Sequence, residues 1–223
     1  MKAVQQRIVD TCIRCGRDPG AVRLVSVTKT MSAETIRLAI QAGAVVFGEN
    51  YIQEAREKCG ALSQYPVSWH FIGHLQTNKA KYAVKLFDLI HTVDSLRLAT
   101  ELDREARKSG KIQNILIQVN IGKESSKSGI DAESAEALIC GISAFPNLSV
   151  QGLMVIPPFF DEPERVRPYF RGLRELRDSL DKPGIAGIRL DELSMGMTGD
   201  FEAAIEEGAT LVRIGTAIFG ERR

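Results

Sequence analysis

The sequence predicts an α/β protein, a single (β/α)8 (TIM) barrel over residues 1–223. Short β-rich apolar runs alternate with amphipathic helical segments, a pattern typical of parallel sheets built from strand–helix units. Eight such runs fit into 223 residues, at the small end of the size range of this barrel. An open, doubly wound sheet is the alternative. It is disfavoured because no Gly-x-Gly-x-x-Gly follows the first run.

The elements follow one another without a linker rich in Pro, Gly or Ser. The expected strands are residues 24–28, 45–48, 68–72, 89–93, 115–120, 150–156, 192–195 and 211–215. Amphipathic stretches between them predict helices at residues 33–42, 51–58, 95–109, 132–144, 162–180 and 200–207. Residues 1–16 form a further helical segment. Because the chain stops just past the eighth run, this segment is expected to supply the missing outer helix.

Composition narrows the class of protein. The formal charge is +1, from 29 Lys and Arg against 28 Asp and Glu, so a nucleic-acid binder with a general basic field is not expected. No apolar run approaches the ~20 residues of a membrane span, and the N-terminus shows no signal-peptide pattern. A cytoplasmic location is therefore expected. Cys12 and Cys15 form one Cys-x-x-Cys without a second pair, which favours helix packing over metal or redox chemistry.

The ends of the seventh and eighth strands carry small, hydroxyl-bearing turns. Residues 194–200 read Ser-Met-Gly-Met-Thr-Gly-Asp and open a helix, and Gly215-Thr216 follows the eighth strand. In such barrels phosphate is frequently held after strands 7 and 8 by backbone N–H groups and a helix dipole. Ordinary helix N-caps remain the alternative for each turn taken alone.

Two cations lie at strand positions that suit chemistry. Lys29 follows the first strand and shares a face with Val25 and Val27, which places its amine over the barrel mouth. Arg213 falls on the face of Leu211, inside the barrel, where a charge needs a partner or a ligand. A solvated lysine at a strand exit is the alternative for Lys29. Together with the two turns, these cations suit a phosphorylated aldehyde held as a Schiff base.

Two other motifs are weaker. His70 and His74 are four residues apart but straddle a strand end, so no metal site is expected. Residues 122–129, Gly-Lys-Glu-Ser-Ser-Lys-Ser-Gly, lack the order of a phosphate loop, and we interpret them as a mobile loop over the barrel mouth.

A set of sequence blocks resembles the YggS/PROSC family of pyridoxal phosphate homeostasis proteins, from residue 24 to residue 220. The blocks are 27–30 (VTKT), 47–51 (FGENY), 69–73 (WHFIG), 75–79 (LQTNK), 126–129 (SKSG), 152–154 (GLM), 193–197 (LSMGM) and 212–220 (VRIGTAIFG). The resemblance implies a fold like the barrel domain of alanine racemase. It also implies pyridoxal 5′-phosphate (PLP) as the cofactor, bound to the lysine that matches Lys29.

The same resemblance implies further site residues. The resemblance implies phosphate contacts at Thr198, Gly215 and Thr216, and an arginine near the pyridine nitrogen at Arg213. Thr198 stands where many relatives have serine, and the hydroxyl is kept. Asn50, at the end of the second strand, is expected to hydrogen-bond the cofactor, although a loop-capping role fits the sequence as well.

The resemblance leaves two functions of different classes. A PLP carrier in intracellular homeostasis, with PLP-dependent apo-enzymes as partners, is expected first, and a PLP-dependent amino-acid racemase second. In alanine racemases the second base is a tyrosine from a separate C-terminal domain of the partner subunit. No tyrosine follows the last predicted strand here. We therefore expect a monomer without catalytic turnover. A Schiff-base aldolase would explain Lys29 and the turns but not the resemblance.

Overall fold

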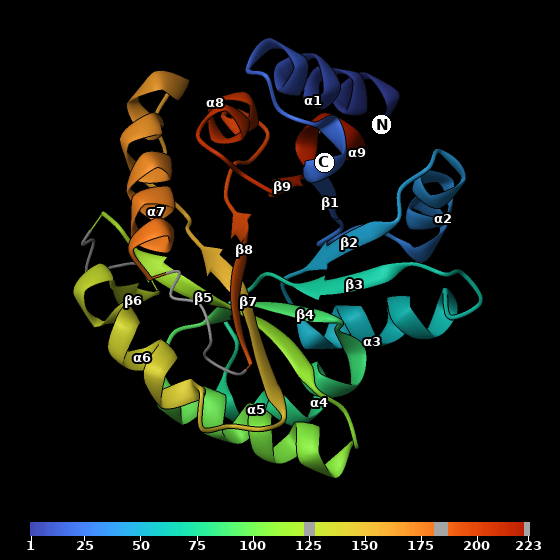
Figure 1. The fold of residues 1–223 in the computed structure, drawn as a ribbon. Coiled ribbons are helices and arrows are strands. Elements are labelled where there is room, and N and C mark those ends of the chain that lie inside the picture. Colours follow the sequence, from blue (N-terminus) through green and yellow to red (C-terminus); the bar gives the residue numbers. More distant parts are fainter. Residues whose placement is uncertain (123–127, 181–186, 221–223) are drawn as a thin grey trace.

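The computed structural model describes residues 1–122, 128–180 and 187–220, and over these residues eight parallel strands close into a barrel (Figure 1). Their order is β4-β3-β2-β1-β9-β8-β7-β5, and β4 also pairs with β5, which closes the ring. The strands are β1 (Arg23–Val27), β2 (Val46–Glu49), β3 (Ser68–Phe71), β4 (Leu89–Val93), β5 (Gln113–Asn120), β7 (Leu148–Met154), β8 (Ile188–Ser194) and β9 (Leu211–Ile214). The predicted barrel is confirmed. A two-residue strand, β6 (Ile130–Asp131), pairs with the end of β5.

Helices surround this barrel on the outside (Figure 1). They are α1 (Lys2–Arg14), α2 (Ala33–Gln41), α3 (Ile52–Ala61), α4 (Ala80–Leu86), α5 (Leu96–Lys108), α6 (Ala135–Ile142), α7 (Arg167–Leu180), α8 (Phe201–Glu206) and α9 (Thr216–Phe219). The N-terminal segment supplies an outer helix as predicted, since α1 packs beside α8. The short α4 was not among the predicted helices. In the described ranges, no helix has the length and apolar character to cross a membrane.

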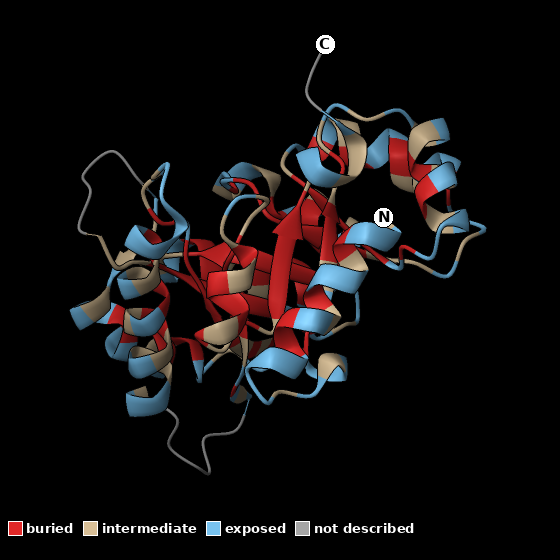
Figure 2. Cartoon of the chain, turned by 90° about the horizontal axis from the view of Figure 1, so that it is seen from above, coloured by how far each residue is buried: buried red, intermediate tan, exposed pale blue. Residues whose placement is uncertain are grey.

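Apolar side chains fill two separate layers. The larger one lies between the helices and the outer faces of the strands, and it includes the fully buried Phe47, Phe170 and Phe201. A smaller cluster takes one residue from each of six strands: Val25, Val46, Leu89, Leu116, Met154 and Leu211. Figure 2 shows the strands as a buried centre inside partly exposed helices. Each fully buried side chain of this kind contributes about 1.5–3 kcal/mol to folding.

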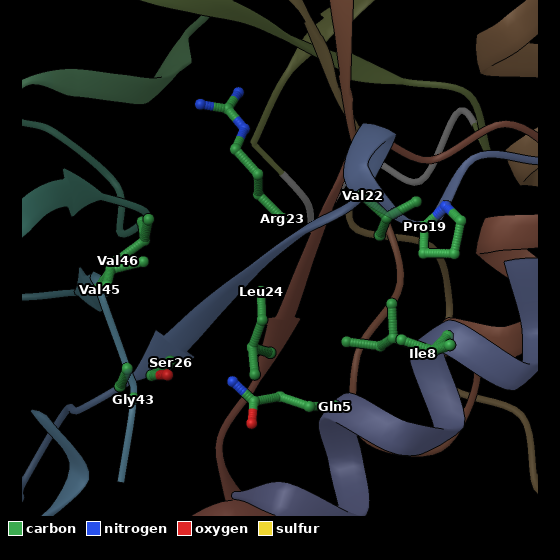
Figure 3. Close-up of a pocket in the computed structure, with 12 residues that line it drawn as sticks. Gln5, Ile8, Pro19, Val22, Arg23, Leu24, Ser26, Gly43, Val45 and Val46 are labelled. Atoms are coloured by element: carbon green, nitrogen blue, oxygen red, sulfur yellow. The ribbon is translucent and has the colours of Figure 1, made fainter. Parts of the chain in front are cut away.

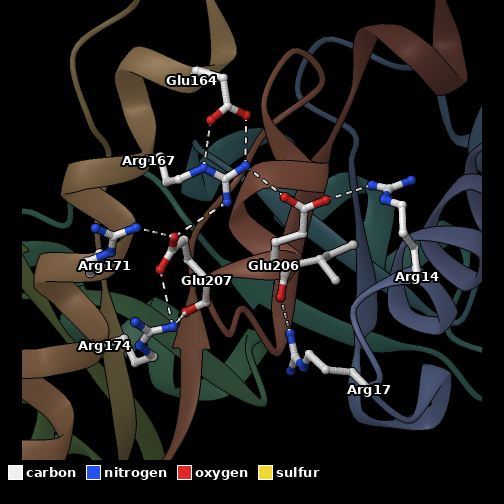
Figure 4. A network of polar contacts seen from close by, with 9 residues as sticks. Arg14, Arg17, Glu164, Arg167, Arg171, Arg174, Glu206 and Glu207 are labelled. Atoms are coloured by element: carbon white, nitrogen blue, oxygen red, sulfur yellow. Dashed lines mark hydrogen bonds and ion pairs between the residues drawn. The ribbon is translucent and has the colours of Figure 1, made fainter.

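Ion pairs at the end of α8 join three helices (Figure 4). Glu207 pairs with Arg171 at 3.1 Å and with Arg174 at 3.2 Å, both on α7. Glu206 pairs with Arg14 of α1 at 2.7 Å. These contacts hold the C-terminal end of α8 between α1 and α7.

Candidate functional site

A cavity of about 420 Å³ lies at the C-terminal ends of the barrel strands. It is lined by all six residues that the sequence analysis expected at a cofactor site, namely Lys29, Asn50, Thr198, Arg213, Gly215 and Thr216. They follow or belong to β1, β2, β8 and β9, so the closed barrel brings distant parts of the chain together. The volume lies within the range of small-molecule sites in proteins.

Lys29 lies in a tight turn directly after β1. The N–H of Met31 donates to the carbonyl oxygen of Thr28 at 3.0 Å, which closes the turn around Lys29 and Thr30. Thr30 has φ +66°, a left-handed conformation that favours glycine and is costly for a β-branched residue. Such strain is typical of functional sites and costs about 1–3 kcal/mol. The surrounding contacts therefore have to hold this turn in place.

A buried network behind the turn supplies those contacts. Lys58 of α3 donates from Nζ to the carbonyl oxygen of Thr28 at 2.7 Å and to Glu49 Oε1 at 2.8 Å. The hydroxyl of Thr28 donates to the same carboxylate at 2.6 Å. Glu54 pairs with Lys58 at 2.9 Å and accepts the N–H of Thr30 at 2.8 Å. Residues on both sides of Lys29 are thus anchored to one ion-pair network.

Two charges of this network, those of Glu49 and Lys58, lie in the protein interior, whereas Glu54 is partly exposed. Glu49 is fully buried, and burial raises the pKa of its carboxyl, while hydrogen bonds from Lys58 and Thr28 oppose that shift. The sequence analysis missed both residues. A glutamate ending an otherwise apolar strand, followed nine residues later by a lysine, was the available signal.

The two hydroxyl-bearing turns meet at one side of the cavity. The hydroxyl of Thr216 donates to Thr198 Oγ1 at 3.1 Å. Asp200 accepts the N–H of Met197 at 2.5 Å, and Gly196 has φ +91°, so the first turn is sharply folded. A side chain at Gly196 would place its Cβ 2.6 Å from the Cβ of Ala204. The glycine is therefore required by both conformation and packing.

The helices that follow these turns are shorter than the sequence analysis assumed. α8 has 6 residues and begins at Phe201, and α9 has 4 residues. The expected helix at residues 200–207 therefore contributes little dipole, and an anion here depends mainly on the threonine hydroxyls and turn N–H groups.

Arg213 is held inside the barrel at the wall of the cavity. It is 4% exposed, and its Nη1 donates to Ser194 Oγ at 2.6 Å while its Nη2 donates to the carbonyl oxygen of Val155 at 2.8 Å. Burial lowers the pKa of Arg213 to about 10, so the guanidinium stays protonated at neutral pH. A fixed positive charge therefore faces the cavity: its two hydrogen-bond partners are neutral, and the carboxylate of Asp200, which lines the same cavity, favours the protonated form.

Asn50 lines this cavity and a neighbouring one, and its side-chain oxygen is buried. This Oδ1 has no hydrogen-bond partner among the described residues. Gly73 lies close behind it, because a Cβ at this glycine would be 2.2 Å from the backbone oxygen of Asn50. An orphaned amide oxygen at a cavity wall is a position where a ligand donor is expected.

The rim of the cavity is apolar on the side that follows β7. Ile156, Pro158, Phe159 and Phe160 line it, and Phe159 is 87% exposed. The loop expected over the mouth at residues 122–129 falls partly outside the described residues, which omit 123–127. Its end is placed by Ser128, whose Oγ is 3.3 Å from Nδ1 of His74.

The histidine and cysteine pairs that the sequence analysis considered do not form a binding site among the residues that the structure describes. Within the described part of the chain, no three metal-ligating side chains come together, and His70 is buried whereas His74 is exposed. Cys12 and Cys15 are free thiols of α1 and its C-terminus, the first buried and the second exposed. A second cavity, of about 300 Å³, lies between α1, β1 and β2 (Figure 3). Its walls are mainly aliphatic and offer little for catalysis.

Comparison with known proteins places this architecture in a family. Residues 13–223 match the model of the alanine racemase N-terminal domain. A pyridoxal phosphate homeostasis protein of Aquifex aeolicus is 47% identical over 223 residues, which cover 100% of this chain and 97% of that protein. The chain belongs to the pyridoxal phosphate homeostasis protein family. The resemblance of the sequence blocks is thereby confirmed.

Further relatives agree with this membership. The family's Escherichia coli K12 member is 42% identical over 222 residues, covering 98% of this chain and 94% of the relative. The structure of PipY from Synechococcus elongatus with PLP bound has a TM-score of 0.85 and 37% identity, covering 97% of this chain and 100% of PipY. An alanine racemase of Clostridium difficile has a TM-score of 0.74 at 14% identity, covering 98% of this chain and 56% of that chain, and shows the fold alone.

Proposed function

We propose that this protein binds PLP and acts in its intracellular homeostasis, holding the cofactor as a Schiff base on Lys29. The observation that carries the proposal is the single cavity that collects Lys29, Asn50, Arg213 and the two threonine turns. Relatives that are 47% and 42% identical to this chain bear the name pyridoxal phosphate homeostasis protein, and PipY was solved with PLP bound.

The donor set of the cavity fits each part of PLP. The hydroxyl pair of Thr198 and Thr216, with the backbone of Gly215, suits the phosphate. The orphaned Oδ1 of Asn50 can accept a hydrogen bond from a cofactor hydroxyl. Arg213, which lines the cavity, would hold the side of the cofactor that carries the ring nitrogen. Lys29 provides the amine that an aldehyde requires.

The same residues favour a carrier over a racemase. When bound, PLP supplies an aldehyde that bonds reversibly to amines and a ring that withdraws electrons. Arg213 disfavours protonation of the ring nitrogen and thereby weakens electron withdrawal. Racemisation also needs an acid/base on each face of the cofactor. No tyrosine or histidine of the described residues lines the cavity, and the carboxylate of Asp200, which does, accepts the N–H of Met197. Transfer to apo-enzymes, a cytoplasmic location, a single domain and a monomeric state remain predictions.

The homeostasis role is tested by cofactor transfer. The PLP-loaded protein is mixed with a PLP-dependent apo-enzyme, and recovery of that enzyme's activity is followed with time. A control measures how fast the loaded protein releases PLP into buffer when a PLP-trapping enzyme is present. We expect the apo-enzyme to recover its activity faster than this release. Recovery no faster than free dissociation would contradict direct transfer, and absence of any bound PLP would contradict the function.

Thr198→Ala and Thr216→Ala are expected to weaken PLP retention. Each removes a charge-assisted hydrogen bond to phosphate worth about 1.5–3 kcal/mol, which corresponds to roughly 10- to 150-fold in affinity. Affinity is measured by titrating apo-protein with PLP and, in parallel, with pyridoxal, which lacks the phosphate. Pyridoxal binding should barely change, and Thr198→Ser should retain PLP. Equal losses for PLP and pyridoxal would mean that the hydroxyls support the fold and do not contact phosphate.

A further inference from the structure

A chain of four buried side chains crosses the interior of the barrel. It runs from Arg213 on β9 to Ser194 on β8, His91 on β4 and His70 on β3. Arg213 Nη1 is 2.6 Å from Ser194 Oγ, His91 Nδ1 is 2.9 Å from the same oxygen, and His91 Nε2 is 3.0 Å from His70 Nδ1. The exposed fractions are 4% for Arg213, 0% for Ser194, 0% for His91 and 3% for His70.

The two ends of this array reach different cavities. Arg213 lines the cavity at the C-terminal ends of the strands. His70 lines a smaller, polar cavity of about 180 Å³ together with Arg23, Ser68, Asp88 and other residues. Arg23 and Ser68 begin β1 and β3, so this polar cavity lies toward the opposite mouth of the barrel.

The charge of Arg213 fixes the direction of every hydrogen bond in the array. A guanidinium only donates, so Ser194 Oγ accepts from Arg213. The Ser194 hydroxyl then donates to His91 Nδ1, the acceptor that the described residues place within reach. His91 therefore carries its proton on Nε2 and donates to His70 Nδ1, and His70 carries its proton on Nε2. The reverse order would leave a buried hydroxyl proton without an acceptor, which is costly.

Both rings are neutral in this arrangement. Burial lowers the pKa of His91 well below the ordinary histidine value, with His70 and Arg213 adding to the effect. Burial also lowers the pKa of His70 to about 4, with Arg23 adding to the shift and Asp88 opposing it. Because both rings are neutral and the hydrogen bonds all run in one direction, the array can hold the Arg213 guanidinium without adding charge to the barrel.

We infer that Ser194, His91 and His70 are positioning residues that fix the Arg213 guanidinium against the cofactor cavity through a one-directional hydrogen-bonded array. The inference rests on the proposed function, because it concerns Arg213 as a cofactor-binding residue. It adds that side chains reaching to the opposite mouth of the barrel set how firmly the cofactor is held. Val155 supplies the second fixed acceptor for Arg213, from its carbonyl oxygen.

The first test reads the tautomers in the apo-protein and needs no cofactor. Nitrogen-15 NMR of the imidazole rings at pH 7 should show His91 and His70 neutral, each with its proton on Nε2. Ser194→Ala should shift the Nδ1 resonance of His91 and leave exposed His74 unchanged. A proton on Nδ1 of His91 in the wild-type protein would overturn the direction of the array.

The second test is a double-mutant cycle on cofactor release. His91→Phe should raise the rate of PLP dissociation on the order of 10-fold, which corresponds to about 1.4 kcal/mol. In an Arg213→Met background, His91→Phe should raise the dissociation rate by less than about twofold, because the array acts through Arg213. His91→Gln keeps an acceptor and a donor, so its rate of PLP dissociation should lie between those of wild type and His91→Phe. This variant replaces His91→Phe in the cycle if His91→Phe does not fold.

An equal change in both backgrounds would contradict a positioning role and indicate a general effect on packing. Failure of the wild-type protein to hold PLP would instead contradict the proposed function, while the NMR result on the array would still stand. The two failures are therefore distinguishable.

Discussion

Lys29→Ala is expected to abolish covalent retention of PLP. The phosphate turns and Arg213 remain in this variant, so weak reversible binding should persist. Loss of the covalent bond should raise the dissociation constant at least about 100-fold, which corresponds to about 2.7 kcal/mol. The measurement is equilibrium dialysis of PLP against wild-type and variant protein, combined with the absorbance of the bound cofactor.

Lys79→Ala provides the matched control. Lys79 lines a neighbouring cavity at the end of β3 and does not line the cofactor cavity. The Lys79→Ala variant should bind PLP as the wild-type protein does. If Lys29→Ala retained the cofactor after dialysis while Lys79→Ala lost it, the assignment of the reactive amine would be wrong.

Lys58→Met is expected to lower the free energy of unfolding by about 3–5 kcal/mol. The change leaves the fully buried Glu49 without its cation and removes a donor to the carbonyl oxygen of Thr28. Chemical denaturation of the apo-protein measures the loss. PLP retention should fall as well, because the turn that carries Lys29 loses an anchor.

Two further variants separate charge from packing at this position. Lys58→Met combined with Glu49→Gln removes both charges and should recover part of the lost stability. Lys85→Met, on the exposed face of α4, should change stability by no more than about 0.5 kcal/mol. If Lys58→Met lowered the free energy of unfolding by no more than Lys85→Met does, the buried ion pair would not hold the turn.

Local patterns predicted the strands and the place of several cavity residues, and the family resemblance assigned the roles of those residues. Runs of β-branched apolar residues with period two place the strands, and side chains directly after such runs must lie at the barrel mouth. Lys29, Thr198, Gly215 and Thr216 follow strands in this way, and Arg213 alternates with apolar neighbours on β9. Strand boundaries shifted by a few residues, since β1 ends at Val27 and β8 begins at Ile188.

The supporting networks could not be read from the sequence. Glu49 and Lys58 interact because α3 packs its buried face behind the end of β2, and that depends on tertiary packing. His91 and His70 lie on neighbouring strands, but the contact of His91 with Ser194 across the barrel depends on strand register and closure. The short α4 was missed because seven residues give too little periodicity for a helix prediction.

Borohydride reduction of the PLP-loaded protein, followed by peptide mapping, tests the central claim most directly. Before reduction the protein should be yellow, with a band near ~420 nm typical of PLP bound to a lysine. After reduction and trypsin digestion, the pyridoxyl group should appear on the peptide of residues 24–37, because modified Lys29 resists cleavage. A pyridoxyl group on another lysine, or a protein that stays colourless with excess PLP, would contradict the account.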